Sequence, residues 1–139
     1  MPIQQDIYEK IVQAKIYIDD NFQDPVDLDL IARHAFISRF HFHRLFRRRI
    51  YNRTPHQYLT TKRIEMAGRL LVENDLSIRE ICNSVGFESQ GTFSLLFKRK
   101  MGCPPNFYRT RVRQQQKKLQ KEPHSQIPQC FCHFFDFGF

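Results

Sequence analysis

The feature that most constrains the fold is a pattern of apolar and basic residues that occurs twice along the chain, about fifty residues apart. The matching segments are 28–35 with 78–85, 38–49 with 89–100, and 55–58 with 105–108. In the first two pairs the apolar residues are spaced three and four apart, which places them on one face of an α-helix. The sequence therefore predicts one helical unit that occurs twice.

Serine and threonine residues mark where the helices of this unit begin. Ser38 and Ser89 each precede an amphipathic stretch. Ser77 begins a capping box with Glu80, and Thr54 is followed by proline at the first helical position. A short helix, a tight turn and a second helix with a basic outer edge have the outline of a helix-turn-helix.

We expect an all-α fold with two helix-turn-helix subdomains joined by a long central helix, because strict apolar alternation is absent before the last ten residues. The expected division of the chain is an N-terminal helix in 1–24, the first helix-turn-helix in 25–56, the linking helix in 57–74, the second helix-turn-helix and a closing helix in 75–113, and a polar linker with an apolar tail in 114–139. For this tail, disorder, packing against the domain and a partner site all stay open.

The net charge of +8 is concentrated in two stretches that contain no acidic residue. Residues 30–64 contain nine Lys or Arg and residues 89–121 contain nine more, so that these stretches hold 18 of the 22 basic residues. A solvated surface usually mixes both signs of charge. Such concentration therefore indicates a polyanionic partner, either nucleic acid or an anionic membrane surface.

The remaining composition favours a reduced, cytoplasmic protein. Apolar residues make up 41% of the chain, which is enough for a core, but no run of eighteen apolar residues and no secretory signal occurs. The four cysteines are too few and too irregularly spaced for a disulfide framework. We expect no membrane span and free thiols.

The first of the two basic helices has an outward face of unusual composition. With Phe42 and Phe46 turned toward the core, the opposite face carries Phe40, His43 and Arg44. An exposed phenylalanine beside these residues suits a major groove, where apolar atoms contact thymine methyl groups and arginine reads guanine. The alternatives are that Phe40 belongs to the core and that His43 and Arg44 are ordinary solvated side chains.

The second basic helix presents Gln90, Thr92, Ser94 and Leu95 outward, and of these only Gln90 can make a bidentate contact with a base. We therefore expect the first unit to specify the DNA sequence and the second mostly to anchor the protein. The residues expected to contact phosphates are the caps and the basic residues of both units: Ser38, Arg39, Arg47, Arg48, Arg49, Arg53, Ser89, Lys98, Arg99 and Lys100.

Motifs of enzymes and metal sites are missing from the sequence. It contains no glycine-rich phosphate loop, no H-E-x-x-H and no nucleophile elbow. Cys130, Cys132 and His133 could donate to zinc, but a zinc site normally needs two separated ligand pairs. We expect no catalytic residues, no cofactor and no metal.

Three stretches carry a resemblance to a known family: "LDLIARHAFISRFHFHRLFRRR", "TPHQYLTTKRIEMAGRLL" and "LSIREICNSVGFESQGTFSLLFKRKMGCPPNFYR". They resemble the DNA-binding domain of AraC/XylS-type bacterial transcriptional regulators, and the resemblance extends over Val26 to Arg109. The resemblance implies two recognition helices in adjacent major grooves. The base-contacting positions that it implies are Phe40, His43, Arg44, Gln90, Gly91, Thr92, Ser94 and Leu95. The chain departs from relatives at Phe36, a turn position often filled by glycine, and at Leu95, where arginine is frequent.

The function expected from these features is sequence-specific binding of double-stranded DNA by a transcriptional regulator, an activator that acts as a monomer on DNA. RNA polymerase is a candidate second partner, and no membrane is expected to take part. The alternatives are the DNA-binding fragment of a longer, ligand-responsive regulator and a non-enzymatic basic module that binds acidic lipids or proteins. RNA binding lacks the usual stacking-sheet and glycine-loop signatures.

Overall fold

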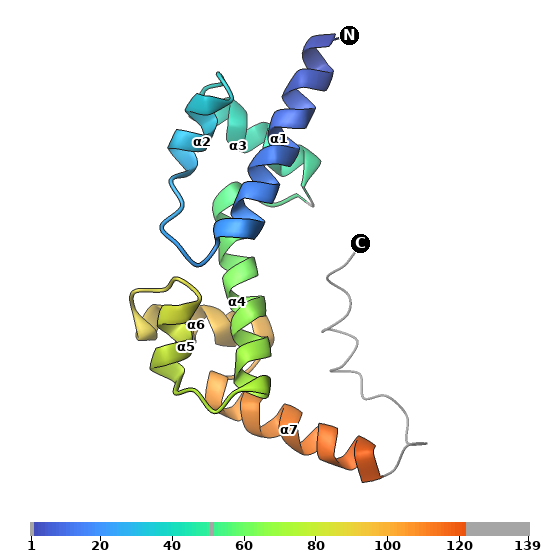
Figure 1. The fold of residues 1–139 in the computed structure, drawn as a ribbon, viewed down its shortest axis with the longest axis vertical. Helices are drawn as coiled ribbons and strands as arrows, with labels where there is room; N and C mark the ends of the chain where they lie inside the picture. Colours follow the sequence, from blue (N-terminus) through green and yellow to red (C-terminus); the bar gives the residue numbers. More distant parts are fainter. Residues whose placement is uncertain (1, 51, 122–139) are drawn as a thin grey trace.

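The computed structural model describes residues 2–50 and 52–121, which form seven helices and no strand. The helices are α1 (Pro2–Asn21), α2 (Leu28–His34), α3 (Arg39–Arg49), α4 (Pro55–Glu73), α5 (Ile78–Ser84), α6 (Gln90–Met101) and α7 (Pro105–Lys121). Figure 1 shows α4 running between two groups of helices, with α1 to α3 at one end and α5 to α7 at the other. The prediction of an all-α fold with two units on a central helix is confirmed.

The predicted helix starts are present as hydrogen-bonded caps. The Oγ atoms of Ser38 and Ser89 accept from backbone N–H groups at the starts of α3 and α6, at 3.2 and 3.3 Å. Thr54 and Ser77 form complete capping boxes at α4 and α5. These bonds satisfy N–H groups that a helix leaves without a partner at its start, so local sequence is sufficient to place the four helices.

One end of the predicted division differs. Helix α7 continues to Lys121, past residue 113, where we expected the polar linker to begin. Gln, Lys and Leu dominate this extension, and all three have high helix propensity. The apolar tail and its Cys130, Cys132 and His133 lie outside the described residues.

Two hydrophobic cores of the same design lie on opposite halves of α4. In the first, Ile11, Ala14 and Ile18 of α1 pack with two buried phenylalanines of α3. In the second, α4 takes over the role of α1, with Ile64, Ala67 and Leu71 packed against two buried phenylalanines of α6. The four phenylalanines, Phe42, Phe46, Phe93 and Phe97, are fully buried. Truncation of any of them to alanine should cost about 3–5 kcal/mol of folding free energy.

The beginning of α4 also belongs to the first core, through Tyr58 and Leu59. Helix α4 is therefore the closing helix of the first unit and the opening helix of the second. Tyr108 of α7 closes the second unit at the position that corresponds to Tyr58. Met66, halfway along α4, packs against both cores.

An arginine of α4 binds carbonyl oxygens just beyond the end of α1. Arg63 Nε donates to the Phe22 carbonyl at 2.6 Å, and its Nη2 donates to the Asp24 carbonyl at 3.0 Å. Carbonyl groups at a helix end have no partner within the helix, and a guanidinium group can bind two of them at once. Arg63 thereby fixes the connection between α1 and α2 to the central helix.

The second unit repeats this arrangement fifty residues later. Arg113 Nε donates to the Val72 carbonyl at 3.2 Å, and its Nη2 donates to the Asn74 carbonyl at 2.7 Å. Its Nη1 also forms an ion pair with the exposed Asp75 at 2.8 Å. The internal repeat therefore includes polar contacts that the apolar pattern did not indicate.

The turns between the helices of each unit have the same geometry although their central residues differ. Phe36 has a φ of 56° and Gly86 a φ of 94°, so both lie in the left-handed region. In each turn the following residue, Ile37 or Phe87, donates its N–H to a carbonyl in the preceding helix, at 3.3 and 3.0 Å. This is the Schellman arrangement, which forms here with phenylalanine in the glycine position.

The closing tyrosines differ in their hydroxyl groups. The Tyr58 hydroxyl donates to Asp19 Oδ1 at 2.6 Å, and Lys15 and Lys62 bind the same carboxylate. Burial alone would raise the pKa of Asp19, but the hydrogen bonds from Lys15, Tyr58 and Lys62 outweigh burial and lower it. The carboxylate is therefore charged at neutral pH and ties α1 to α4.

Tyr108 has no such acceptor. Its hydroxyl is buried and, within the described part of the chain, lacks a hydrogen-bond partner. Burial raises the pKa of Tyr108 to about 12, so the hydroxyl keeps its proton at neutral pH. A buried polar group without a partner carries its full desolvation cost.

Removal of the two hydroxyl groups should therefore have opposite effects. We expect Tyr58→Phe to lower the free energy of unfolding by about 1–2 kcal/mol, because it loses a hydrogen bond to a carboxylate. Tyr108→Phe should leave it unchanged or raise it by up to about 1 kcal/mol. Urea denaturation of both variants beside the wild type measures the difference, and equal losses in the two variants would contradict this reading of the two sites.

Phe36 allows a test of backbone strain. A left-handed conformation costs a residue other than glycine about 1 kcal/mol or more. We expect Phe36→Gly to be more stable than Phe36→Ala by about 1 kcal/mol, although glycine in most helical contexts is the less stable choice. Thermal denaturation of the pair gives the answer, and a more stable alanine variant would argue against the left-handed turn.

Candidate nucleic-acid interface

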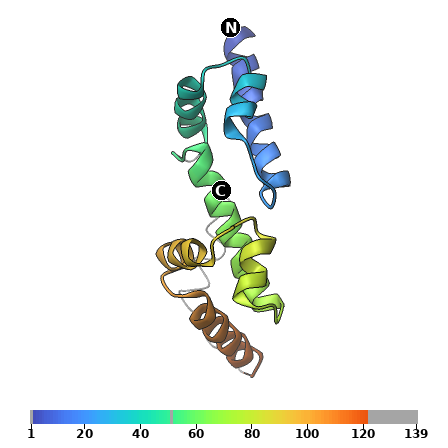
Figure 2. The same ribbon diagram turned by 90° about the vertical axis from the view of Figure 1, so that its left-hand side faces the viewer.

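Helices α3 and α6 lie on the same side of α4, as Figure 2 shows for the teal and gold segments. Each packs its phenylalanines into the core of its own unit and leaves its other face exposed. Each also begins at a serine cap, so that the positive end of the helix dipole is at the exposed start of the helix. Such helix starts attract phosphate groups.

The outward face of α3 carries the three residues expected there. Phe40 is 79% exposed, which excludes the alternative that it belongs to the core. Arg44 is exposed, and the half-buried His43 lies with its ring edge-on to Phe42 at 6.2 Å between centroids. This face combines an apolar side chain, an imidazole and a guanidinium, which together can contact thymine methyl groups and guanine edges.

The outward face of α6 carries mostly small side chains, and fewer of them than on α3 can form hydrogen bonds with bases. Leu95 is 58% exposed, Gln90 and Thr92 are exposed, and Ser94 is half-buried. Gly91, on the same surface, has only the Ser89 Oγ near the position of a Cβ, at 3.8 Å. A surface of short side chains can approach the DNA closely but offers few donors and acceptors to base edges.

The residues expected to contact phosphates differ in their interaction partners in the free protein. Arg48, Lys98 and Arg99 are exposed at the ends of α3 and α6. Three others have partners on the protein surface, and these pairs are Arg39 with Asp29 at 3.3 Å, Arg47 with Asn52 at 3.1 Å, and Arg49 with the ring of Tyr8 at 5.7 Å. Exposed pairs of this kind contribute about 0–1 kcal/mol, so a phosphate can replace them.

Arg53 and Lys100 lie deeper, where the two units approach α4. Both are half-buried, and the charges of both act on Glu65 of α4. Burial lowers the pKa of Lys100, as does the charge of Arg53, while Glu65 raises it. Burial also raises the pKa of Glu65, against four surrounding basic residues. These two expected phosphate ligands are thus partly covered, and the charges of both act on one carboxylate.

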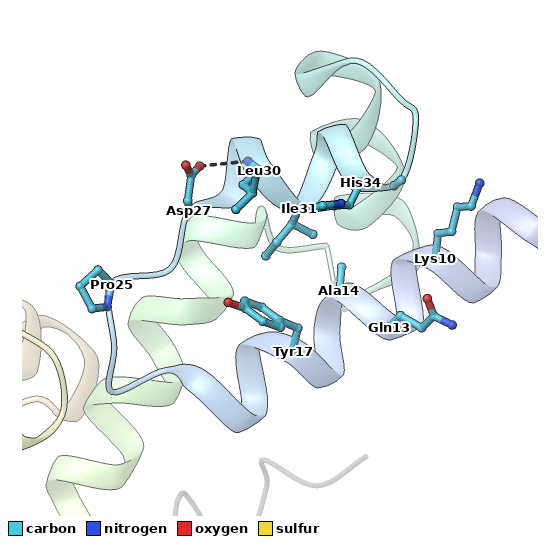
Figure 3. A pocket seen from close by; sticks show the side chains of 10 residues that line it. Lys10, Gln13, Ala14, Tyr17, Pro25, Asp27, Leu30, Ile31 and His34 are labelled. Atoms are coloured by element: carbon cyan, nitrogen blue, oxygen red, sulfur yellow. Dashed lines mark hydrogen bonds between the residues drawn. The ribbon is translucent and has the colours of Figure 1, made fainter.

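A groove of about 480 Å³ lies between α1 and α2, and none of the residues expected to contact DNA lines it. Figure 3 shows Ala14 and Tyr17 of α1 facing Ile31 and His34 of α2 across it. The sequence did not predict this groove, because two helices form its walls and the distance at which they pack cannot be read from the sequence. The prediction also missed Arg63 and Arg113, although their recurrence at an interval of fifty was a signal.

Within residues 5–50 and 52–121, no three His, Cys, Asp or Glu side chains converge as they would around a metal ion. Cys82 and Cys103 are free and buried. In the same part of the chain, no helix combines the length and the apolar character that crossing a bilayer requires.

Comparison with known proteins identifies the domain. A helix-turn-helix domain model matches residues 31–111. The regulatory protein SoxS of Escherichia coli is 30% identical over 106 residues, which are 76% of this chain and 98% of SoxS. The chain belongs to the AraC/XylS family. Its two units are the paired helix-turn-helix subdomains of the DNA-binding domain of this family.

Two solved structures extend the comparison. The DNA-binding domain of AdpA, a global transcriptional factor solved in complex with a target DNA, matches with a TM-score of 0.68 and 27% identity, over 83% of this chain and 97% of that one. The xylose-binding transcription activator XylR matches with a TM-score of 0.62 and 27% identity, over 73% of this chain and 27% of that one.

The chain does not cover every AraC/XylS relative equally. It spans nearly all of SoxS but only 30–39% of the length of three other curated relatives.

The departure at Phe36 does not disturb the turn, which has the geometry of the glycine-containing turn in the second unit.

Proposed function

We propose that this chain is a sequence-specific transcriptional regulator that inserts α3 and α6 into successive major grooves on one side of a DNA duplex. The observation that carries the proposal is the position of both helices on the same side of α4, each with its non-core face exposed. The AdpA domain, which was solved with its target DNA, has the same arrangement of the chain over most of its length.

The length of α4 suits this geometry. Its 19 residues correspond to about 28 Å at the usual helical rise. Successive major grooves on one side of B-DNA are about 34 Å apart. A slightly short spacer means that the duplex bends to meet both units, at a cost of order 1–6 kcal/mol.

We propose that the two units divide the work. Phe40, His43 and Arg44 read bases in the first half-site, because they combine exposure with groups that recognise thymine and guanine. Gln90, Thr92, Ser94 and Leu95 make close contacts of lower selectivity in the second. The serine caps and the basic residues at the helix ends bind phosphates, and Arg48, Lys98 and Arg99 are among those that are exposed.

One chain supplies both helix-turn-helix units, so we propose that a monomer binds the site, whereas most helix-turn-helix proteins need a dimer. We also propose a cytoplasmic, non-enzymatic activator without a cofactor that contacts RNA polymerase. The description of XylR as a transcription activator supports the direction of regulation. The longer relatives support the alternative that this domain works within a ligand-responsive regulator.

The test of the proposal is in vitro selection of duplexes by the purified protein, followed by footprinting of the selected site. The expected result is one consensus with two protected segments about 10–11 base pairs apart on one side of the duplex. Selection of no consensus, with equal binding to anionic vesicles, would favour the basic interaction module instead.

Affinity for the selected site should fall steeply with salt. About six to ten phosphate contacts predict a loss of about 10³–10⁵ in affinity between 50 and 200 mM salt, because binding releases counterions from the DNA. Fluorescence anisotropy across this range measures the slope. A slope near zero would mean that phosphates are not what the basic helix ends bind.

Arg44 and Arg48 should separate base reading from phosphate binding, since they lie on the same helix and carry the same charge. We expect Arg44→Ala to cost about 1–3 kcal/mol on the selected site and to relax the base preference at one position. Arg48→Ala should weaken binding to selected and random duplexes by the same factor. Equal losses on both duplexes for Arg44→Ala would contradict its assignment as a base reader.

A further inference from the structure

The contact around Arg63 joins the two units directly, in addition to the helix that they share. Besides binding the Phe22 and Asp24 carbonyls of the first unit, the guanidinium of Arg63 lies over the ring of Phe87, at 5.8 Å from its centroid. Phe87 follows the turn between α5 and α6, so it belongs to the second unit. One side chain of α4 thus contacts the connection after α1 and the turn before α6.

Gly86, in that turn, brings the two backbones together. A Cβ at Gly86 would lie 2.8 Å from the Gln23 carbonyl oxygen, 3.0 Å from the Phe22 carbonyl oxygen and 3.0 Å from Arg63 Nε. Such distances are closer than side-chain carbons approach backbone oxygens, so only glycine permits this packing. The turn that orients α6 therefore rests against the segment that Arg63 holds.

We propose that Arg63 is a positioning residue that sets the spacing and the rotation between the two half-sites that this protein accepts. The inference rests on the proposed function and concerns the same DNA site. The two cores can tilt relative to each other by bending α4 between Leu59 and Ile64, because the buried side chains of α4 belong to one core each and only the partly buried Met66 packs against both. Arg63 lies between these ends and resists the tilt with two hydrogen bonds and a ring contact.

DNA makes this tilt measurable. One inserted base pair moves the second major groove by about 3.4 Å along the axis and rotates it by about 34°. A protein with fixed units can satisfy only one spacing, whereas a protein whose units tilt can follow the second groove. The penalty for a changed spacing therefore reports on Arg63 independently of the contacts that each helix makes with its own half-site.

The experiment compares Arg63→Met with Arg113→Met, using the selected duplex and versions with one base pair added or removed between the half-sites. Arg113 makes the equivalent carbonyl bonds in the second unit, at 3.2 and 2.7 Å, but its bonds lie within that unit. For the wild type we expect each change of spacing to lower affinity about tenfold or more. For Arg63→Met the same change should lower affinity less than about threefold, while Arg113→Met should keep the wild-type penalty.

A second matched pair keeps the test decisive if Arg63→Met fails to fold by circular dichroism. Gly86→Ala forces the two backbones apart, whereas Gly102→Ala, at a φ of 84° with nothing within 4 Å, introduces backbone strain alone. Gly86→Ala should reduce the loss of affinity that a changed half-site spacing causes, and Gly102→Ala should leave that loss unchanged.

Three results would overturn the inference: an unchanged spacing penalty in Arg63→Met, an unchanged penalty in Gly86→Ala, or an equally reduced penalty in Arg113→Met. All three leave the proposed function intact, since the variants still select the site. A wild type that prefers no duplex over random DNA would instead refute the proposed function itself.

Discussion

The structure depends on one helix that belongs to two hydrophobic cores. Tyr58 and Leu59 of α4 complete the first core, and Ile64, Ala67 and Leu71 open the second. Neither unit can leave α4 without exposing its buried phenylalanines to water, which costs about 1.5–3 kcal/mol for each side chain. Each unit is therefore attached to its own half of α4 by hydrophobic packing, not by a flexible linker.

The recognition helices combine two opposite requirements in a dozen residues. Phe42 and Phe46 anchor α3 from inside, while Phe40, two residues before Phe42, is 79% exposed. The helix thus presents apolar groups on both faces, and its last turn carries three arginines. The partners of the basic residues in the free protein, such as Asp29 for Arg39, are weak and exposed. They hold the side chains near the surface without competing strongly with DNA.

The two units are most alike in their hydrophobic cores and least alike in their polar contacts. Arg63 and Arg113 occupy equivalent positions and bind equivalent carbonyls, yet only Arg63 also contacts the other unit. Tyr58 and Tyr108 close equivalent cores, yet among the residues that the structure describes only Tyr58 finds an acceptor for its hydroxyl. Apolar packing tolerates duplication because it needs only volume and burial, whereas a hydrogen bond needs a particular partner at a particular distance.

Much of the candidate site could be predicted from the sequence for a physical reason. The serine caps and the spacing of Phe42, Phe46, Phe93 and Phe97 are local signals, and they determine which face of each helix is buried and hence that Phe40, Arg44 and Leu95 point outward. What the pattern could not reveal was the state of Arg53 and Lys100, which approach Glu65 only after the two units have packed on α4.

By itself, the sequence determined the helices, their caps, the two cores and the outward faces, because these follow from periodicity and from contacts a few residues apart. Only the tertiary structure decided how the two units are placed relative to each other. Arg63 and Gly86 contact the connection after α1, and Arg63 lies 41 residues from Phe22, whose carbonyl it binds. No local pattern encodes a contact of that range, since it exists only when the chain has folded back on itself.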